Sequence, residues 1–254
     1  QGLADSRLIR AGFAFIVVGI GLKLALFPLH LWLPNAYTYA PSAVTVFLAA
    51  TSTKVAVYLL MRFMFTVFGP EYTFEQLTLT YLFLPLALFG MFIPSIVAVF
   101  QANVKRLLAY SSVAQIGYML LGISFATVSG IAAGTIHLFN HALMKGTLFM
   151  AVAAMALRVG STDLDSFSGL GKRMPWTMAA FGLAGLSLVG VPLTVGFVSK
   201  WLLIAAAIES GVWWVAILIV ASSLIALIYI WRIMEVAYLR PLPDSVEARE
   251  APLS

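Results

Sequence analysis

The sequence of 254 residues contains no cysteine, and only 10% of its residues are charged. Without cysteine the chain offers no disulfide, thiolate nucleophile or iron–sulfur ligand. Soluble domains have about 25% charged residues, so the scarcity of charge argues against a soluble protein. The net charge of +5 comes from scattered basic residues rather than a basic run or patch, which argues against nucleic-acid binding.

The sequence also lacks a recognisable cofactor motif. The stretch GLGK at residues 169–172 superficially resembles a phosphate loop, but it lacks the required spacing and the following Ser or Thr. No carboxylate lies in the middle of an apolar segment. We therefore expect no cofactor and no bond chemistry in this chain.

Continuous apolar runs are abundant instead, because 62% of the residues are hydrophobic. Runs of about 20 apolar residues predict membrane-crossing helices, whereas β-barrels give short alternating segments. The predicted fold is an all-α, polytopic membrane bundle over residues 1–240, followed by a polar cytoplasmic tail at 241–254. About seven spans are expected, at residues 8–27, 43–64, 79–100, 104–124, 131–157, 176–208 and 212–238.

The basic residues predict the orientation of the bundle. One side collects six of them: Lys105, Arg106, Arg158, Lys172, Arg173 and Arg240. The other side has three: Arg7, Arg10 and Arg62. The positive-inside rule places the richer side in the cytoplasm, with the N-terminus outside a plasma membrane.

The sixth span is too long for one straight crossing. Gly190, Pro192 and Gly196 interrupt it, and Lys200 follows. Proline removes an amide donor and glycine tolerates unwinding, so we predict a break between about 188 and 197.

The first span has the same combination, because Lys23 is followed by Pro28 and Pro34. Paired interrupted helices are typical of inverted-repeat transporters with a site near mid-membrane.

The fifth span carries His137, His141 and Lys145 at spacing i, i+4, i+8. On a helix they form one stripe that rises about 12 Å. Such a stripe fits a proton relay, since ionisable groups in a membrane usually face a bundle interior or a wet cavity. Two alternatives stay open: a metal site at the two histidines, and a plain buried histidine at 137.

Three more lysines lie inside apolar spans: Lys23, Lys54 and Lys200. A buried lysine can exchange protons once its environment favours the neutral amine. The alternatives are snorkelling of the ammonium to the interface and ordinary helix–helix hydrogen bonding. With the fifth-span stripe, these lysines complete a predicted relay of six residues.

Four strings together resemble the proton-conducting antiporter-like family, which includes the large membrane subunits of respiratory complex I and of multisubunit Na⁺/H⁺ antiporters. They are GIGLKLALFPLHLWLP at 19–34, KRLLAYSSVAQIGY at 105–118, HLFNHALMK at 137–145 and GVPLTVGFVSK at 190–200. In their details the strings resemble the antiporter branch of the family most. The resemblance implies that Lys23 and Lys200 belong to two broken helices. It also implies that Lys54, His137, His141 and Lys145 belong to a hydrophilic axis between them.

The resemblance covers the C-terminal half of the family pattern. The first half would supply a membrane glutamate that pairs with Lys23, and we expect it from elsewhere. The favoured function is a membrane subunit of a multisubunit cation/proton antiporter that moves protons, with Na⁺ as a second candidate ion and other membrane subunits as partners. The alternatives are a proton-pumping subunit of a complex I-like or hydrogenase assembly, and a non-conducting structural half-subunit.

Overall fold

The computed structural model describes residues 6–241 and residue 250. Across these residues the chain is helical, and its only β feature is an isolated bridge between Asn103 and Asp163. The predicted all-α membrane bundle is confirmed. Most of the predicted tail, 241–254, lies outside the described residues.

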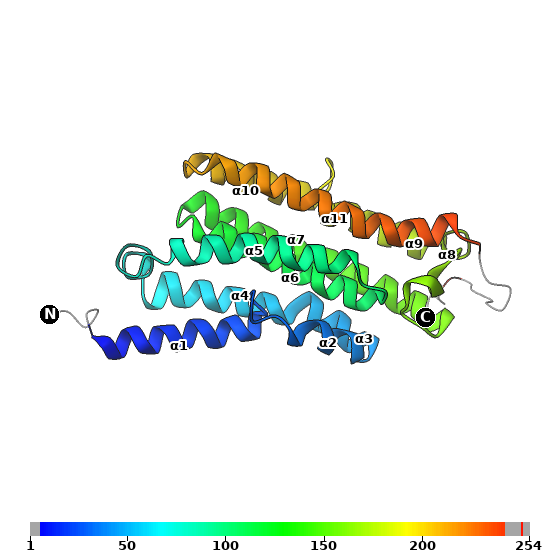
Figure 1. The fold of residues 1–254 in the computed structure, drawn as a ribbon, viewed down its shortest axis with the longest axis horizontal. Coiled ribbons are helices and arrows are strands. Elements are labelled where there is room, and N and C mark those ends of the chain that lie inside the picture. The colour runs from blue at the N-terminus through cyan, green and yellow to red at the C-terminus, as the bar shows by residue number, and fades with distance from the viewer. Residues whose placement is uncertain (1–5, 242–249, 251–254) are drawn as a thin grey trace.

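Five helical segments are long and apolar enough to cross a membrane, and they lie roughly along one axis in Figure 1. The first, Ser42–Val67, combines α3 (Ser42–Phe47), α4 (Thr53–Arg62) and π-helical turns at Leu48–Ser52 and Phe63–Val67. The others are α5 (Thr80–Val99), α6 (Val104–Ser124), α7 (Val128–Val159) and α11 (Trp213–Leu239). The connections contain short turns at Glu71–Gln76 and Leu164–Phe167, and the four-residue α8 (Leu170–Arg173).

The two remaining expected spans are both broken helices. In the first, α1 (Arg7–Leu24) ends at Ala25, whose φ of 59° is left-handed, and α2 begins at Trp32 and runs to Tyr39. Pro28 lies in the irregular segment between them, as expected. Pro34, however, does not interrupt a helix. It lies in the first turn of α2, where backbone amides have no intrahelical acceptor, so proline fits there.

The second break separates α9 (Pro175–Val189) from α10 (Val195–Glu209). Gly190 ends α9 with a left-handed φ of 90°. Gly196 lies so close to α9 that a Cβ there would be 1.7 Å from the carbonyl oxygen of Ser187. The interruption predicted from Pro192 and the two glycines is therefore present, and Gly196 allows the two half-helices to touch.

Helix α6 forms the centre of the bundle, since every residue in it except Arg106 is buried. Glycines allow its neighbours to approach closely. A Cβ on Gly117 would be 2.9 Å from the Ala87 carbonyl oxygen of α5, and one on Gly122 would be 2.6 Å from the Gly130 carbonyl oxygen of α7. Side chains of α6 therefore face α5, α7 and the broken helices.

One end of the bundle holds the loops after α5, α7 and α11. Asn103 bridges to Asp163, and Arg240 pairs with Asp165 at 2.7 Å. Helix α1 begins at the opposite end in Figure 1. The six basic residues expected on one side of the membrane all lie at the end of the bundle that holds the loops after α5, α7 and α11. We call it the basic end.

Candidate functional site

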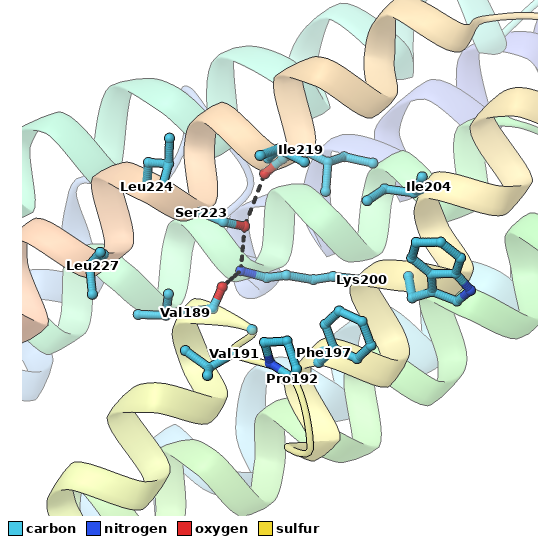
Figure 2. Close-up of a pocket in the computed structure, with 13 residues that line it drawn as sticks. Val189, Val191, Pro192, Phe197, Lys200, Ile204, Ile219, Ser223, Leu224 and Leu227 are labelled. Carbon is cyan, nitrogen blue, oxygen red and sulfur yellow. Dashed lines mark hydrogen bonds between the residues drawn. The ribbon is translucent and has the colours of Figure 1, made fainter.

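Lys200 starts in the second half of a broken helix and reaches back to the first. From α10, its ammonium donates to the carbonyl oxygens of Leu188 (3.0 Å) and Val189 (2.8 Å) at the end of α9, and to Ser223 Oγ (2.9 Å) of α11. Figure 2 shows this convergence of three helices on one nitrogen. All three donors of the charged amine are used, and the carbonyl end of a helix is electronegative. The break thus forms a cradle for a lysine cation.

A cavity of about 320 Å³ lies beside this cradle, between α10 and α11. The Lys200 ammonium and the Ser223 hydroxyl are polar groups in a lining whose other side chains are apolar. The cavity therefore has one polar corner, at the Lys200 ammonium.

Tyr118 of α6 links Lys200 to the histidines. The Lys200 ammonium is 4.7 Å from the centre of the Tyr118 ring, and that ring is 5.5 Å from the ring of His137. The tyrosine hydroxyl lies 3.4 Å from Ser223 Oγ. An aromatic face attracts a cation, so the ring also favours charged Lys200.

His137 has a hydrogen-bond partner on each ring nitrogen. Its Nδ1 is 2.9 Å from Ser199 Oγ, and its Nε2 is 2.9 Å from Gln115 Oε1. Ser199 Oγ also lies 3.1 Å from the carbonyl oxygen of Gly196. In neutral His137 the serine can donate to Nδ1. In the imidazolium, Nδ1 donates to the serine, whose proton turns to the Gly196 carbonyl. Rotation of one hydroxyl therefore accommodates both protonation states.

His141 lies one turn away, with its ring parallel to that of His137 and 6.4 Å from it. It is fully buried, and neither ring nitrogen has a hydrogen-bond partner among the described residues. Buried polar atoms normally form hydrogen bonds. Among the buried lysines and histidines on α4, α7 and α10, His141 is the one with no hydrogen-bond partner in the described part of the chain.

Lys145 and Lys54 complete the buried set. The Lys145 ammonium donates to the carbonyl oxygen of Leu108 (2.8 Å) and to Ser111 Oγ (2.5 Å) of α6. The Lys54 ammonium donates to the carbonyl oxygen of Ala49, in the π-helical turn before α4. Both lysines use neutral acceptors, as Lys200 does.

Five of the six predicted relay residues are therefore buried in one region: Lys54, His137, His141, Lys145 and Lys200. Lys23 differs, because its side chain is exposed near the end of α1. As for the metal alternative, no group of three or more His, Cys, Asp or Glu side chains in the described part of the chain could hold a metal ion.

Residues 1–226 match the family described as NADH:quinone oxidoreductase/Mrp antiporter, transmembrane. The chain belongs to this family. It is 41% identical, over 99% of its length, to NADH-quinone oxidoreductase subunit N of Desulforudis audaxviator. The match covers 50% of that protein, so this chain spans about half the length of the curated relative.

Two solved structures containing family members resemble the fold. One is the Mrp complex from Dietzia sp., with a TM-score of 0.88 and 30% identity over 97% of this chain and 45% of that one. The other is respiratory complex I from Thermus thermophilus, with a TM-score of 0.79 and 28% identity over 98% and 53%. The motifs favoured an antiporter subunit, whereas the subunit N relative favours the complex I-like alternative.

Several polar residues that contact the buried lysines and histidines, or the break beside Lys200, were not predicted as site residues from the sequence: Tyr118, Gln115, Ser199, Ser223, Ser111 and Asn140. Asn140 donates to the carbonyl oxygen of Val195 at 2.7 Å and so fixes the start of α10 against α7. The available signal was position: Ser199 precedes Lys200, and Asn140 precedes His141. Ser111, Gln115 and Tyr118 lie within the string at 105–118, but nothing in that string pairs them with Lys145, His137 or Lys200, and Ser223 lies outside all four strings.

Proposed function

We propose that this chain carries the Lys/His part of a proton path in a membrane subunit of a complex I-like, redox-driven assembly. One observation carries the proposal: five ionisable side chains are buried inside the bundle, Lys200 on α10, His137, His141 and Lys145 on α7, and Lys54 on α4. We call these five residues the column. Redox chemistry and its cofactors would belong to partner subunits, and protons would be the ion moved here.

The column suits transfer because its charges are held by neutral acceptors. A carboxylate beside a buried lysine would favour the charged amine and oppose proton release. Lys200, Lys145 and Lys54 instead bond to carbonyl and hydroxyl oxygens. His137 can take up and release a proton when the Ser199 hydroxyl rotates. Neither ring nitrogen of His141 has a hydrogen-bond partner among the described residues, so both are available to a proton.

Lys23 would contribute from the edge of this column. An exposed ammonium within a membrane span is costly unless a polar group meets it. We propose that a carboxylate outside the described residues pairs with Lys23, supplied by a neighbouring segment or subunit. The basic end would face the cytoplasm, as the positive-inside rule requires.

The likeness to the Mrp complex favours a second candidate, a cation/proton antiporter subunit. The two differ in energy source. Proton uptake driven by an electron donor and unaffected by removing Na⁺ supports the redox assembly. Uptake driven by a Na⁺ gradient without an electron donor supports the antiporter.

Lys200→Arg tests the relay in either case. Arginine retains the charge, but with a pKa above about 12 it cannot release its proton. A relay predicts that Lys200→Arg and Lys200→Ala both lose proton translocation in vesicles while the complex still assembles on native gels. A purely structural charge predicts that only Lys200→Ala fails.

The matched control is Lys105→Arg. The Lys105 ammonium also donates to a carbonyl oxygen, that of Ala40 at 3.1 Å, but it lies at the basic end, away from the column. We expect this variant to translocate protons normally. Normal translocation by the Lys200→Arg complex would refute the relay role of that residue.

A further inference from the structure

A second cavity, of about 410 Å³, lies at the basic end of the bundle. Three cationic side chains line it, from Lys172, Arg173 and Arg240, together with Tyr238 and Leu239. Within the described part of the chain, only one acid, Asp165, makes an ion pair with any of them, by accepting from Arg240 at 2.7 Å. The lining therefore carries an excess of positive charge that the relay does not use.

The backbone beside the cavity is tied to α11. Gly169 adopts a left-handed φ of 71°, and its amide donates to the carbonyl oxygen of Val236 on α11. A Cβ on Gly171 would be 2.5 Å from the ring of Tyr238, so the α8 loop rests directly on α11. The loop that holds Lys172 and Arg173 is thus tied to the helix that precedes Arg240, and all three cations line the same cavity.

The surroundings have the character of a membrane interface. Leu239 is 72% exposed beside the cavity, and Trp176, at the start of α9, is 80% exposed. Trp231 on α11 and Leu183 on α9 are also exposed apolar side chains, and they lie further from the basic end along the two helices. Tryptophan is enriched at the headgroup level of membranes, so the cationic cavity lies above a surface suited to acyl chains.

We propose that this cavity binds the phosphate headgroup of an anionic phospholipid. Arginine presents paired N–H donors that match phosphate oxygens, and lysine adds a point charge. Basic pockets of this kind at the cytoplasmic ends of transmembrane helices accept anionic lipids. The acyl chains lie over Leu239 and Trp231.

The test compares the intact complex with a Lys172→Gln/Arg173→Gln double variant in nanodiscs of phosphatidylcholine containing a minor fraction of phosphatidylglycerol. Each cation near a membrane surface contributes about a fivefold preference for anionic lipid, so the double variant is expected to lose about 25-fold in phosphatidylglycerol binding. Bound lipid is counted by native mass spectrometry after extraction. Asp165→Asn, which removes the carboxylate paired with Arg240, is expected to strengthen binding.

The control is Arg7→Gln/Arg62→Gln, which removes the same charge from exposed positions at the opposite end. Unchanged binding by this control, with loss in the first variant, supports a specific site. Three results overturn the proposal: equal losses in both double variants, full binding in Lys172→Gln/Arg173→Gln, or complete displacement of the lipid by millimolar inorganic phosphate, which would indicate a site for free phosphate.

Discussion

Gly196→Ala is the substitution for which the structure gives the clearest magnitude. The new Cβ would lie 1.7 Å from the Ser187 carbonyl oxygen, whereas ordinary van der Waals contact begins at 3.4 Å. The obstacle is backbone, so α9 and α10 must separate by roughly 1.7 Å. Such a shift exceeds what the bonds from Lys200 to Leu188 and Val189, at 3.0 and 2.8 Å, can absorb.

The cost follows from these bonds. A hydrogen bond to a charged group contributes about 1.5–3 kcal/mol, so losing two costs about 3–6 kcal/mol, and overpacking adds about 1–3 kcal/mol. Ser199 also moves with α10, which lengthens its bond to His137. We expect a complex of reduced thermal stability in which proton translocation falls at least tenfold.

The assay is donor-driven proton uptake by inverted vesicles, followed with a pH-sensitive dye and normalised to assembled complex on native gels. Gly19→Ala is the matched control, because a Cβ there meets nothing within 4 Å. Alanine also favours a helix over glycine by about 1 kcal/mol, so this variant is expected to be at least as stable as the parent and to take up protons normally. Wild-type stability and uptake in Gly196→Ala would refute the claim that close contact of the half-helices holds the Lys200 cradle.

Three further predictions address the column, the first break and the orientation. Gln115→Leu removes the acceptor of His137 Nε2 and leaves a buried N–H unpaired, at a cost of about 1–3 kcal/mol, so proton uptake is expected to slow while assembly persists. Trp32→Phe removes the 2.8 Å hydrogen bond to the Leu22 carbonyl and is expected to lower the free energy of unfolding by about 1 kcal/mol. Proton uptake is expected to stay unchanged, because an indole does not exchange protons at neutral pH. Lys172→Cys, exposed in a chain without native cysteine, is expected to react with an impermeant maleimide only in inverted vesicles; labelling in intact cells would reverse the orientation.

The sequence predicted the features that depend on local chemistry. The second break follows from Pro192 and its flanking glycines, because backbone groups freed by proline must be satisfied elsewhere in a membrane. Helical periodicity places His137, His141 and Lys145 on one stripe, and the cost of three ionisable groups in a membrane predicts that this stripe is buried. Neither inference needed knowledge of the neighbouring helices.

The contacts between helices were beyond such reasoning. Ser223 reaches Lys200, and Gln115 reaches His137, from other helices, and spacing along the chain does not encode these pairs. The exposure of Lys23 was hidden for a related reason. Hydropathy identifies a membrane span but does not distinguish a face that meets protein from one that does not, so a lysine in an apolar run looks the same in either place.

Both helix breaks leave backbone carbonyls that need a hydrogen-bond donor, but the donors differ in whether they can release a proton. This difference favours the second break as part of the proposed relay. At the first break the Leu22 carbonyl is held by the indole of Trp32, a donor that keeps its proton. At the second, the carbonyls of Leu188 and Val189 are held by Lys200, a donor that can release one. Loss of that proton removes the charge from the end of α9 and frees a lone pair beside Tyr118 and Ser223. At the second break, loss of a proton from Lys200 would therefore also change the contacts of α10 with α9 and α11.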